Sequence, residues 1–222
     1  MPGYPRRVIL GIDSSAGTAV AVVSNDGFIH ADVVHPNPRG HAEVIGELIT
    51  QALRDAEVTA GQITHVAAGM GPGPFTGLRV GIAAARAFAW ARELPVVPVP
   101  SHDAAALHLM LHDALLGTER PPFAVVTDAR RRELAYTVYT GFDDDGLPER
   151  TQPTTLAPAD QLAIVLADLG ATGVNVDAIS GASIGILAAR AGAAGRVDVD
   201  QQPVYLRAPD VTESAGPKRV TA

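Results

Sequence analysis

The amino-acid sequence predicts an α/β fold built from two small domains. Two observations support this prediction: residues 8–100 read as three strands followed by alternating helices and strands, and the second half begins again with a pair of strands. Of the 222 residues, 47% are hydrophobic and 18% are charged, a balance that can form ordinary globular cores. No apolar run approaches the roughly 20 residues that a membrane-spanning helix needs.

Three strand-like runs open the chain, and we expect them to form an antiparallel meander. Residues 8–12 and 19–23 are continuously apolar, as central strands covered on both faces are. Residues 27–34 alternate between apolar and polar side chains, which indicates a half-buried strand. Glycine and asparagine residues between the runs supply the turns.

Helices and strands then alternate. Apolar residues at helical spacing predict a helix over residues 40–57. A strand is expected over 65–69, and a Gly/Pro turn leads into a helix over about 76–92. Residues 95–100 complete a βββαβαβ order with a short strand.

The second half repeats the hairpin start. Strands are expected over 123–127, 134–140 and 174–179, and helices over 162–169 and 181–194. A hairpin-first sheet with crossover helices, present twice, suggests two small actin-like (ASKHA, ribonuclease H-like) domains with mixed sheets. We expect the domains to cover residues 1–102 and 103–208, followed by a flexible tail over 209–222.

Composition excludes several kinds of site. The chain has no cysteine, which rules out disulfides, thiolate zinc sites and a cysteine nucleophile, and which fits a cytoplasmic protein. The net charge of -7 should not attract phosphate backbones to the chain as a whole. One short cationic cluster stands out, formed by Arg130, Arg131 and Arg132.

Residues 71–81, GPGPFTGLRVG, join a predicted strand to a predicted helix. They do not form a Walker A loop, because no Lys-Ser/Thr pair follows the glycines. From physical chemistry alone, a tight strand-to-helix turn with close packing is the favoured interpretation. The helix that follows is apolar around most of its circumference, so it should be buried on more than one side. Its small residues Gly77, Gly81 and Ala84 would let another helix approach, either the first helix or a partner protein.

Five motifs in order resemble the TsaB (YeaZ) family, glycoprotease-like paralogues of TsaD. The stretch at residues 71–81 is the most specific, and the other four are individually weak. The motifs cover roughly residues 8–209 and read ILGIDSS at 9–15, HAE at 41–43, GPGPFTGLRVG at 71–81, DARRREL at 128–134 and VYLR at 204–207.

The resemblance implies a non-catalytic scaffolding subunit that forms a heterodimer with the TsaD paralogue. In this family TsaD carries the threonylcarbamoyl-transfer site, the ATPase TsaE joins the pair, and the product is threonylcarbamoyladenosine next to the tRNA anticodon. Contact with tRNA would be indirect or weak, with no membrane association. The expected partner interface comprises His41, Glu43, Val44, Leu48, Gly71, Pro72, Gly73, Phe75, Thr76, Gly77, Arg79, Gly81, Ala84 and Phe88.

No catalytic, cofactor-binding or metal-binding residues are expected in this subunit. The paired histidines of TsaD-type enzymes are broken here, because Ile45 stands four residues after His41. Asp13 could begin a first phosphate hairpin, but arginines follow Asp128 where a second hairpin would need glycines. His108 and His112 have helical i, i+4 spacing, yet their apolar surroundings favour histidines at the protein surface. The pair Gly181-Ala182 fits either a relic of an adenosine-binding motif or a tight strand-to-helix turn.

Three alternatives remain open on the sequence. One is an actin-like phosphotransferase, which would need the missing phosphate hairpin. Another is a metallopeptidase-like enzyme, which would need a metal triad. The third is a stand-alone homodimer whose apolar helices pair with their own copy, and nothing in the sequence excludes it.

Overall fold

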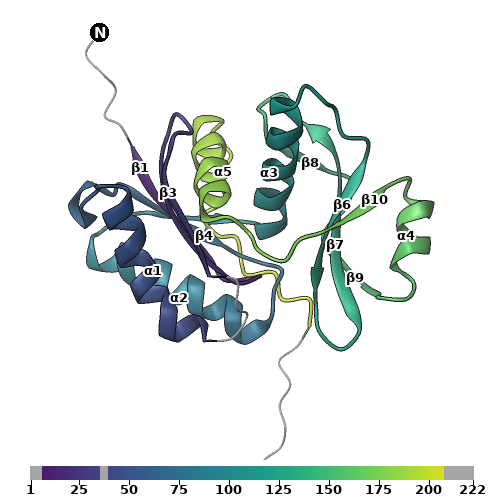
Figure 1. Cartoon of the computed structure of the whole chain (residues 1–222), viewed down its shortest axis with the longest axis horizontal. Helices are drawn as coiled ribbons and strands as arrows, with labels where there is room; N and C mark the ends of the chain where they lie inside the picture. The colour runs from purple at the N-terminus through teal and green to yellow at the C-terminus, as the bar shows by residue number, and fades with distance from the viewer. Residues whose placement is uncertain (1–6, 36–39, 208–222) are drawn as a thin grey trace, which may run out of the picture.

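The computed structural model describes residues 7–35 and 40–207 and contains two mixed sheets with helices between and outside them (Figure 1). The first sheet has the order β3-β2-β1-β4-β5. Its first three strands form the predicted antiparallel meander, and β4 and β5 run parallel to β1. The strands are β1 (Val8–Asp13), β2 (Thr18–Ser24), β3 (Ile29–His35), β4 (His65–Gly69) and β5 (Val96–Val99).

Helices cover both faces of this sheet, which explains why every residue of β2 is buried. On one face lie α1 (His41–Asp55) and α2 (Phe75–Ala91), packed side by side (Figure 1). The short 3-10 helix η1 (Ala60–Gln62) leads from α1 towards β4. The other face is covered by α5 (Gly181–Ala193), which comes from the far end of the chain.

The second sheet has the order β10-β6-β7-β8, with β9 paired to β7. α3 (Ser101–Leu115) covers its inner face and α4 (Leu162–Asp168) its outer face (Figure 1). The predicted strand over 174–179 is wrong in its bounds, because the paired strand ends earlier and the following residues lead into α5. The strands are β6 (Phe123–Asp128), β7 (Glu133–Phe142), β8 (Pro148–Arg150), β9 (Thr155–Pro158) and β10 (Thr172–Asn175).

The two halves share one core, because α3 and α5 pack against each other between the sheets. Glycines bring α5 close to the first sheet: a Cβ atom on Gly181 would lie 2.7 Å from the backbone nitrogen of Ala21. A Cβ on Gly185 would lie 2.5 Å from a methyl group of Val23. Gly181 therefore serves helix-to-sheet packing. The boundary at residue 102 stays a prediction, and the packing adds that α5 lies on the first sheet.

The actin-like fold class is confirmed, since each half has a hairpin-first mixed sheet with crossover helices. Across residues 7–35 and 40–207, no helix is both long enough and apolar enough to cross a membrane.

Candidate functional site at residues 71–81 and the interdomain cleft

Residues 71–81 pack against the turn that joins β1 to β2. A Cβ on Gly77 would lie 2.8 Å from His41 Nε2, and one on Gly81 would lie 2.3 Å from Ser14 Oγ. The hydroxyl of Ser14 donates a hydrogen bond to the Gly77 carbonyl at 2.8 Å and accepts one from the Gly81 N–H at 2.9 Å. The close approach of α2 to this turn thus requires glycine at both positions.

This packing places part of the predicted partner interface inside the chain. Gly77 and Gly81 face Ser14 inside the chain, so they are not available to a facing helix of another protein. Leu48 lies in the core under α1, because it is on the side of the helix that covers the sheet. The predicted interface residues that are buried in this way are Leu48, Gly71, Pro72, Gly77 and Gly81.

The remaining predicted residues are half-buried or exposed. Glu43, Thr76 and Arg79 are exposed. The half-buried ones are His41, Val44, Gly73, Phe75, Ala84 and Phe88.

The outward side of α2 carries an apolar stripe on which sequence reasoning did not place the contact. Ala83, Ala87 and Trp90 are exposed at helical spacing, and Trp90 is 86% exposed. Two exposed arginines, Arg79 and Arg86, flank these residues on the same face of the helix, since Arg79 is four residues before Ala83 and Arg86 is four residues before Trp90. The signal that could have found the stripe is the i, i+4, i+7 spacing from Ala83, read as a face separate from the glycine row. An exposed tryptophan beside small apolar residues is typical of a protein contact surface.

Asp13 is buried at the end of β1, and its two carboxylate oxygens accept hydrogen bonds from within the chain. Oδ1 accepts bonds from the Ser15 N–H at 2.8 Å and from the Ser15 hydroxyl at 2.6 Å, and Oδ2 accepts one from the Ser101 hydroxyl at 2.6 Å. Desolvation by burial raises the pKa of Asp13, and the bonds from Ser101 and Ser15 oppose that rise. The Gly71 N–H donates in turn to Ser101 Oγ at 2.9 Å. Asp13 thus joins the strand end, the loop after β4 and the start of α3.

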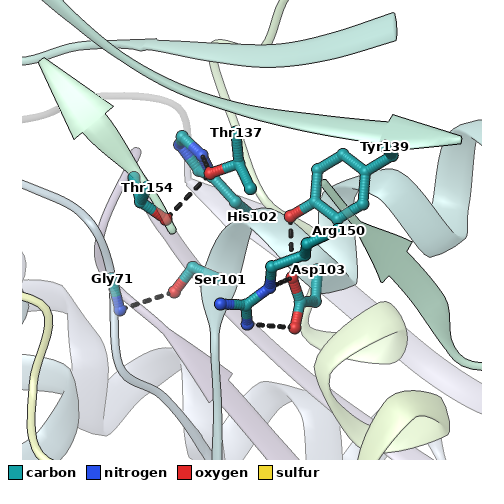
Figure 2. A network of polar contacts seen from close by, with 8 residues as sticks. All are labelled: Gly71, Ser101, His102, Asp103, Thr137, Tyr139, Arg150 and Thr154. Atoms are coloured by element: carbon teal, nitrogen blue, oxygen red, sulfur yellow. Dashed lines mark hydrogen bonds and ion pairs between the residues drawn. The ribbon is translucent and has the colours of Figure 1, made fainter. Parts of the chain in front are cut away.

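The start of α3 also contacts the second sheet, as Figure 2 shows. His102 is buried, with Nδ1 2.8 Å from Thr137 Oγ1 and Nε2 2.9 Å from Thr127 Oγ1. Burial lowers the pKa of His102 to about 3, so the ring is neutral near pH 7. Thr137 lies 2.8 Å from Thr154 Oγ1, which extends the network (Figure 2).

Asp103, the next residue, bonds to partners that neither Ser101 nor His102 contacts. The Tyr139 hydroxyl donates to Asp103 Oδ1 at 2.7 Å, and Arg150 forms an ion pair with the same carboxylate (Figure 2). Although Ser101, His102 and Asp103 are the residue types of a hydrolase triad, each bonds to a different part of the fold. They therefore hold the two sheets together and do not form a relay from nucleophile to base. Sequence reasoning missed this cluster; the signal was three polar residues directly after Pro100 at a helix start.

A cavity of about 460 Å³ lies between the halves of the molecule. Residues 72–76, 127–131 and 204–207 supply most of its lining. On its first-sheet side, the Arg79 guanidinium lies 3.7 Å from the centroid of the Phe75 ring and donates from Nε to the Tyr205 hydroxyl at 3.3 Å. The rings of Phe75 and Tyr205 are 5.0 Å apart. Arg79, predicted to contact a partner, therefore also holds the C-terminal segment in place.

The turn between β6 and β7 forms the facing wall. Arg130, Arg131 and Arg132 have φ angles of 66°, 55° and 62°, in the left-handed region that side chains disfavour. The Arg130 N–H donates to Asp128 Oδ1 at 2.8 Å. Behind the turn, Arg207 forms an ion pair with Glu133. Arginine side chains thus stand where glycines would form a second phosphate hairpin.

The two spaced histidines of α3, His108 and His112, are both exposed. Within the part of the chain that the structure describes, no three His, Cys, Asp or Glu side chains are grouped as a metal site requires.

Comparisons with known proteins place these features in a family. The family model described as "TsaD: tRNA N6-adenosine threonylcarbamoyltransferase" matches residues 31–154, more than half of the chain. A tRNA N6-adenosine threonylcarbamoyltransferase of Streptococcus suis is 39% identical over 151 residues, covering 61% of this chain and 44% of the relative. The corresponding protein of Streptococcus mutans is 35% identical over the same coverage. The chain thus matches less than half the length of these curated relatives.

Solved structures show the same fold. A structure described as "YeaZ from Pseudomonas aeruginosa" superposes with a TM-score of 0.73 at 24% identity, covering 90% of this chain and all of that one. A second Pseudomonas aeruginosa structure, described as an uncharacterized protein with similarity to peptidase YEAZ, agrees equally well.

Proposed function

We infer that this chain, which belongs to the TsaD family of tRNA N6-adenosine threonylcarbamoyltransferases, serves tRNA modification as a scaffolding subunit. In this proposal it pairs in the cytoplasm with the TsaD paralogue, which performs the transfer to adenosine. The ATPase TsaE then joins the pair.

The observation that carries the proposal is the exposed apolar stripe on α2. Ala83, Ala87 and Trp90 present small side chains and one indole on the outside of the first domain. A facing helix can approach the two alanines closely, and the indole can fill a pocket on the partner as an interface anchor. Partner contact at this face would bury Trp90, whose exposure is costly in a monomer.

The positions at which an actin-like ATPase would bind phosphate, and at which TsaD-type enzymes have paired histidines, support a non-catalytic role. Hydroxyl and backbone donors of the chain itself occupy both oxygens of Asp13. His41 Nδ1 lies 2.7 Å from Thr18 Oγ1 and has no histidine one helical turn away. At the β6–β7 turn, Arg130 and Arg131 line the cleft where a phosphate hairpin would need glycine.

Co-purification with the TsaD paralogue tests the interface. Trp90→Glu should abolish pairing, because it places a charge in an apolar contact, while the melting temperature stays within a few degrees of wild type. Leu115→Glu is the matched control: Leu115 is 88% exposed at the end of α3, far along the chain from α2. Equal pairing by both variants would refute the α2 interface.

Reconstitution tests the division of labour. The paralogue with this chain should modify tRNA, and the chain without the paralogue should not. Modification by this chain alone would overturn the scaffolding role. Mass measurement of the chain by itself shows whether the same stripe forms a homodimer when the paralogue is absent.

A further inference from the structure

Two cavities along the junction of the domains differ in the sign of their charge. The cavity beside residues 72–76 is lined by Arg130, Arg131 and Arg207 and by one aspartate, Asp128; because Arg207 is paired with Glu133, Arg130 and Arg131 supply its positive charge. A second cavity of about 470 Å³, between β5, α5 and β8, is lined by four acidic residues and two arginines. In a chain with a net charge of -7, the first cavity is therefore a local cationic site.

The positively charged side chains of this cavity belong to the turn between β6 and β7, whose backbone has left-handed φ angles. Arg130 and Arg131 lie next to each other with left-handed φ angles at the end of the β6–β7 hairpin, and both are exposed. The Arg130 guanidinium lies 3.5 Å from Asp128, but both side chains are more than half exposed, so the pair is weak and its geometry can change. Guanidinium groups bind phosphate oxygens in bidentate fashion, which suits them to a phosphodiester.

An aromatic surface lies in the same cavity. Tyr205 is 39% exposed, its ring contacts the Phe75 ring, and its hydroxyl accepts a hydrogen bond from Arg79. Because the ring is already fixed, a planar group could stack on it without the entropy cost of ordering the side chain. Cations beside a fixed aromatic ring are the combination that binds unpaired nucleotides. An acidic protein surface would use the arginines but not the ring.

We propose that this cavity receives one nucleotide of a single-stranded RNA segment, with its phosphate against Arg130 and Arg131 and its base on Tyr205. The volume of about 460 Å³ is within the range of about 300–1,000 Å³ of small-ligand sites. The proposal rests on the proposed function in tRNA modification, and it adds a direct contact between this subunit and the RNA.

Fluorescence anisotropy of the full chain with a labelled RNA of anticodon-loop sequence tests the site. Arg130→Ser with Arg131→Ser should weaken binding and make the slope of log affinity against log salt shallower by about 0.7, for the one phosphate that the variant no longer neutralises. Tyr205→Leu should weaken binding about tenfold and leave the salt slope unchanged. The control double variant, Arg54→Ser with Arg92→Ser, removes the same charge from exposed positions outside the cavity and should bind like wild type.

Competitors identify the ligand class. Unlabelled RNA should displace the probe at far lower concentration than adenosine monophosphate or polyglutamate of matched charge. Equal effects of the two double variants, an unchanged affinity of Tyr205→Leu, or displacement by polyglutamate as readily as by RNA would each overturn the proposal. Tighter binding of the mononucleotide than of the RNA would overturn it as well.

Pairing of the same variants with the TsaD paralogue separates the two proposals. Unaltered RNA binding by the cavity variants, together with normal pairing, would refute the RNA site and leave the scaffolding role intact. A wild-type chain that does not pair with the paralogue would refute the scaffolding role instead.

Discussion

At the scale of single residues, buried polar side chains determine how stability responds to pH. His102 is neutral in the folded protein, with a pKa of about 3, while an unfolded histidine has a pKa of about 6.5. Its contribution to stability is therefore complete above pH 6.5 and is lost as the pH falls from 6.5 towards 3. Asp13 acts in the opposite direction at lower pH, because its raised pKa favours proton binding by the folded state.

We expect the wild-type protein to lose about 2 kcal/mol of unfolding free energy between pH 7 and pH 5 through His102. His102→Gln keeps groups that can bond to Thr127 and Thr137 but cannot be protonated in this range. Urea unfolding at both pH values should show a smaller loss for His102→Gln than for wild type. An identical pH dependence in the two proteins would mean that His102 is not held neutral.

Gly81 gives a second prediction at this scale. Gly81→Leu should lower the unfolding free energy of the isolated chain by about 3 kcal/mol, because its Cβ would overlap Ser14 Oγ. Ala83→Leu, two residues on and exposed, should change it by no more than about 0.5 kcal/mol. Thermal unfolding of both variants without a partner makes the comparison. If the Gly81→Leu chain were stable but did not pair with the TsaD paralogue, Gly77 and Gly81 would belong to the partner interface after all.

At the scale of elements, the β6–β7 turn carries backbone strain that glycine would relieve. Arg132 has a φ of 62° and does not line the cavity. Arg132→Gly should therefore raise the melting temperature, corresponding to about 1 kcal/mol, while Arg132→Ala should not. RNA binding should stay the same in both variants. A destabilised Arg132→Gly would show that the side chain, and not the backbone, matters at this position.

The same scale shows what could be predicted from the sequence. Periodicity located α1, α2, β4 and α5 within two residues, because each is bounded by glycine or proline and has a clear apolar pattern. It did not find β8 or β9, because these strands are only three and four residues long and are too short to show a period of two. Periodicity also showed that α2 is apolar on more than one side, but not which side faces its own chain. The contact of Gly77 and Gly81 with Ser14 joins residues more than sixty positions apart, so local patterns carry no signal for it.

At the scale of the whole molecule, the two halves are interleaved and not simply joined. Ile9 and Val23 of the first sheet pack in the same core as Leu187 of α5 and Leu107 of α3. A fragment of residues 1–102 would leave that face of the sheet exposed to water.

We therefore expect residues 1–102 alone to aggregate or to unfold without a cooperative transition, whereas the full chain unfolds cooperatively. Circular dichroism during heating distinguishes the two outcomes, and a fragment of 1–102 with residues 181–193 attached through a flexible linker is the matched control. A cooperative transition in the short fragment would show that α5 is dispensable for the first sheet.

The position of α5 has a consequence for how the protein is made. A ribosome delivers the five strands of the first sheet early, since β5 ends at Val99, but delivers α5 only when residue 193 has been added. Domains generally fold in the order of their synthesis. Here, however, one face of the first sheet stays uncovered until α5 has been synthesised. During that interval the nascent chain exposes Ile9, Ala21 and Val23 and is a natural client for a chaperone that shields apolar strands.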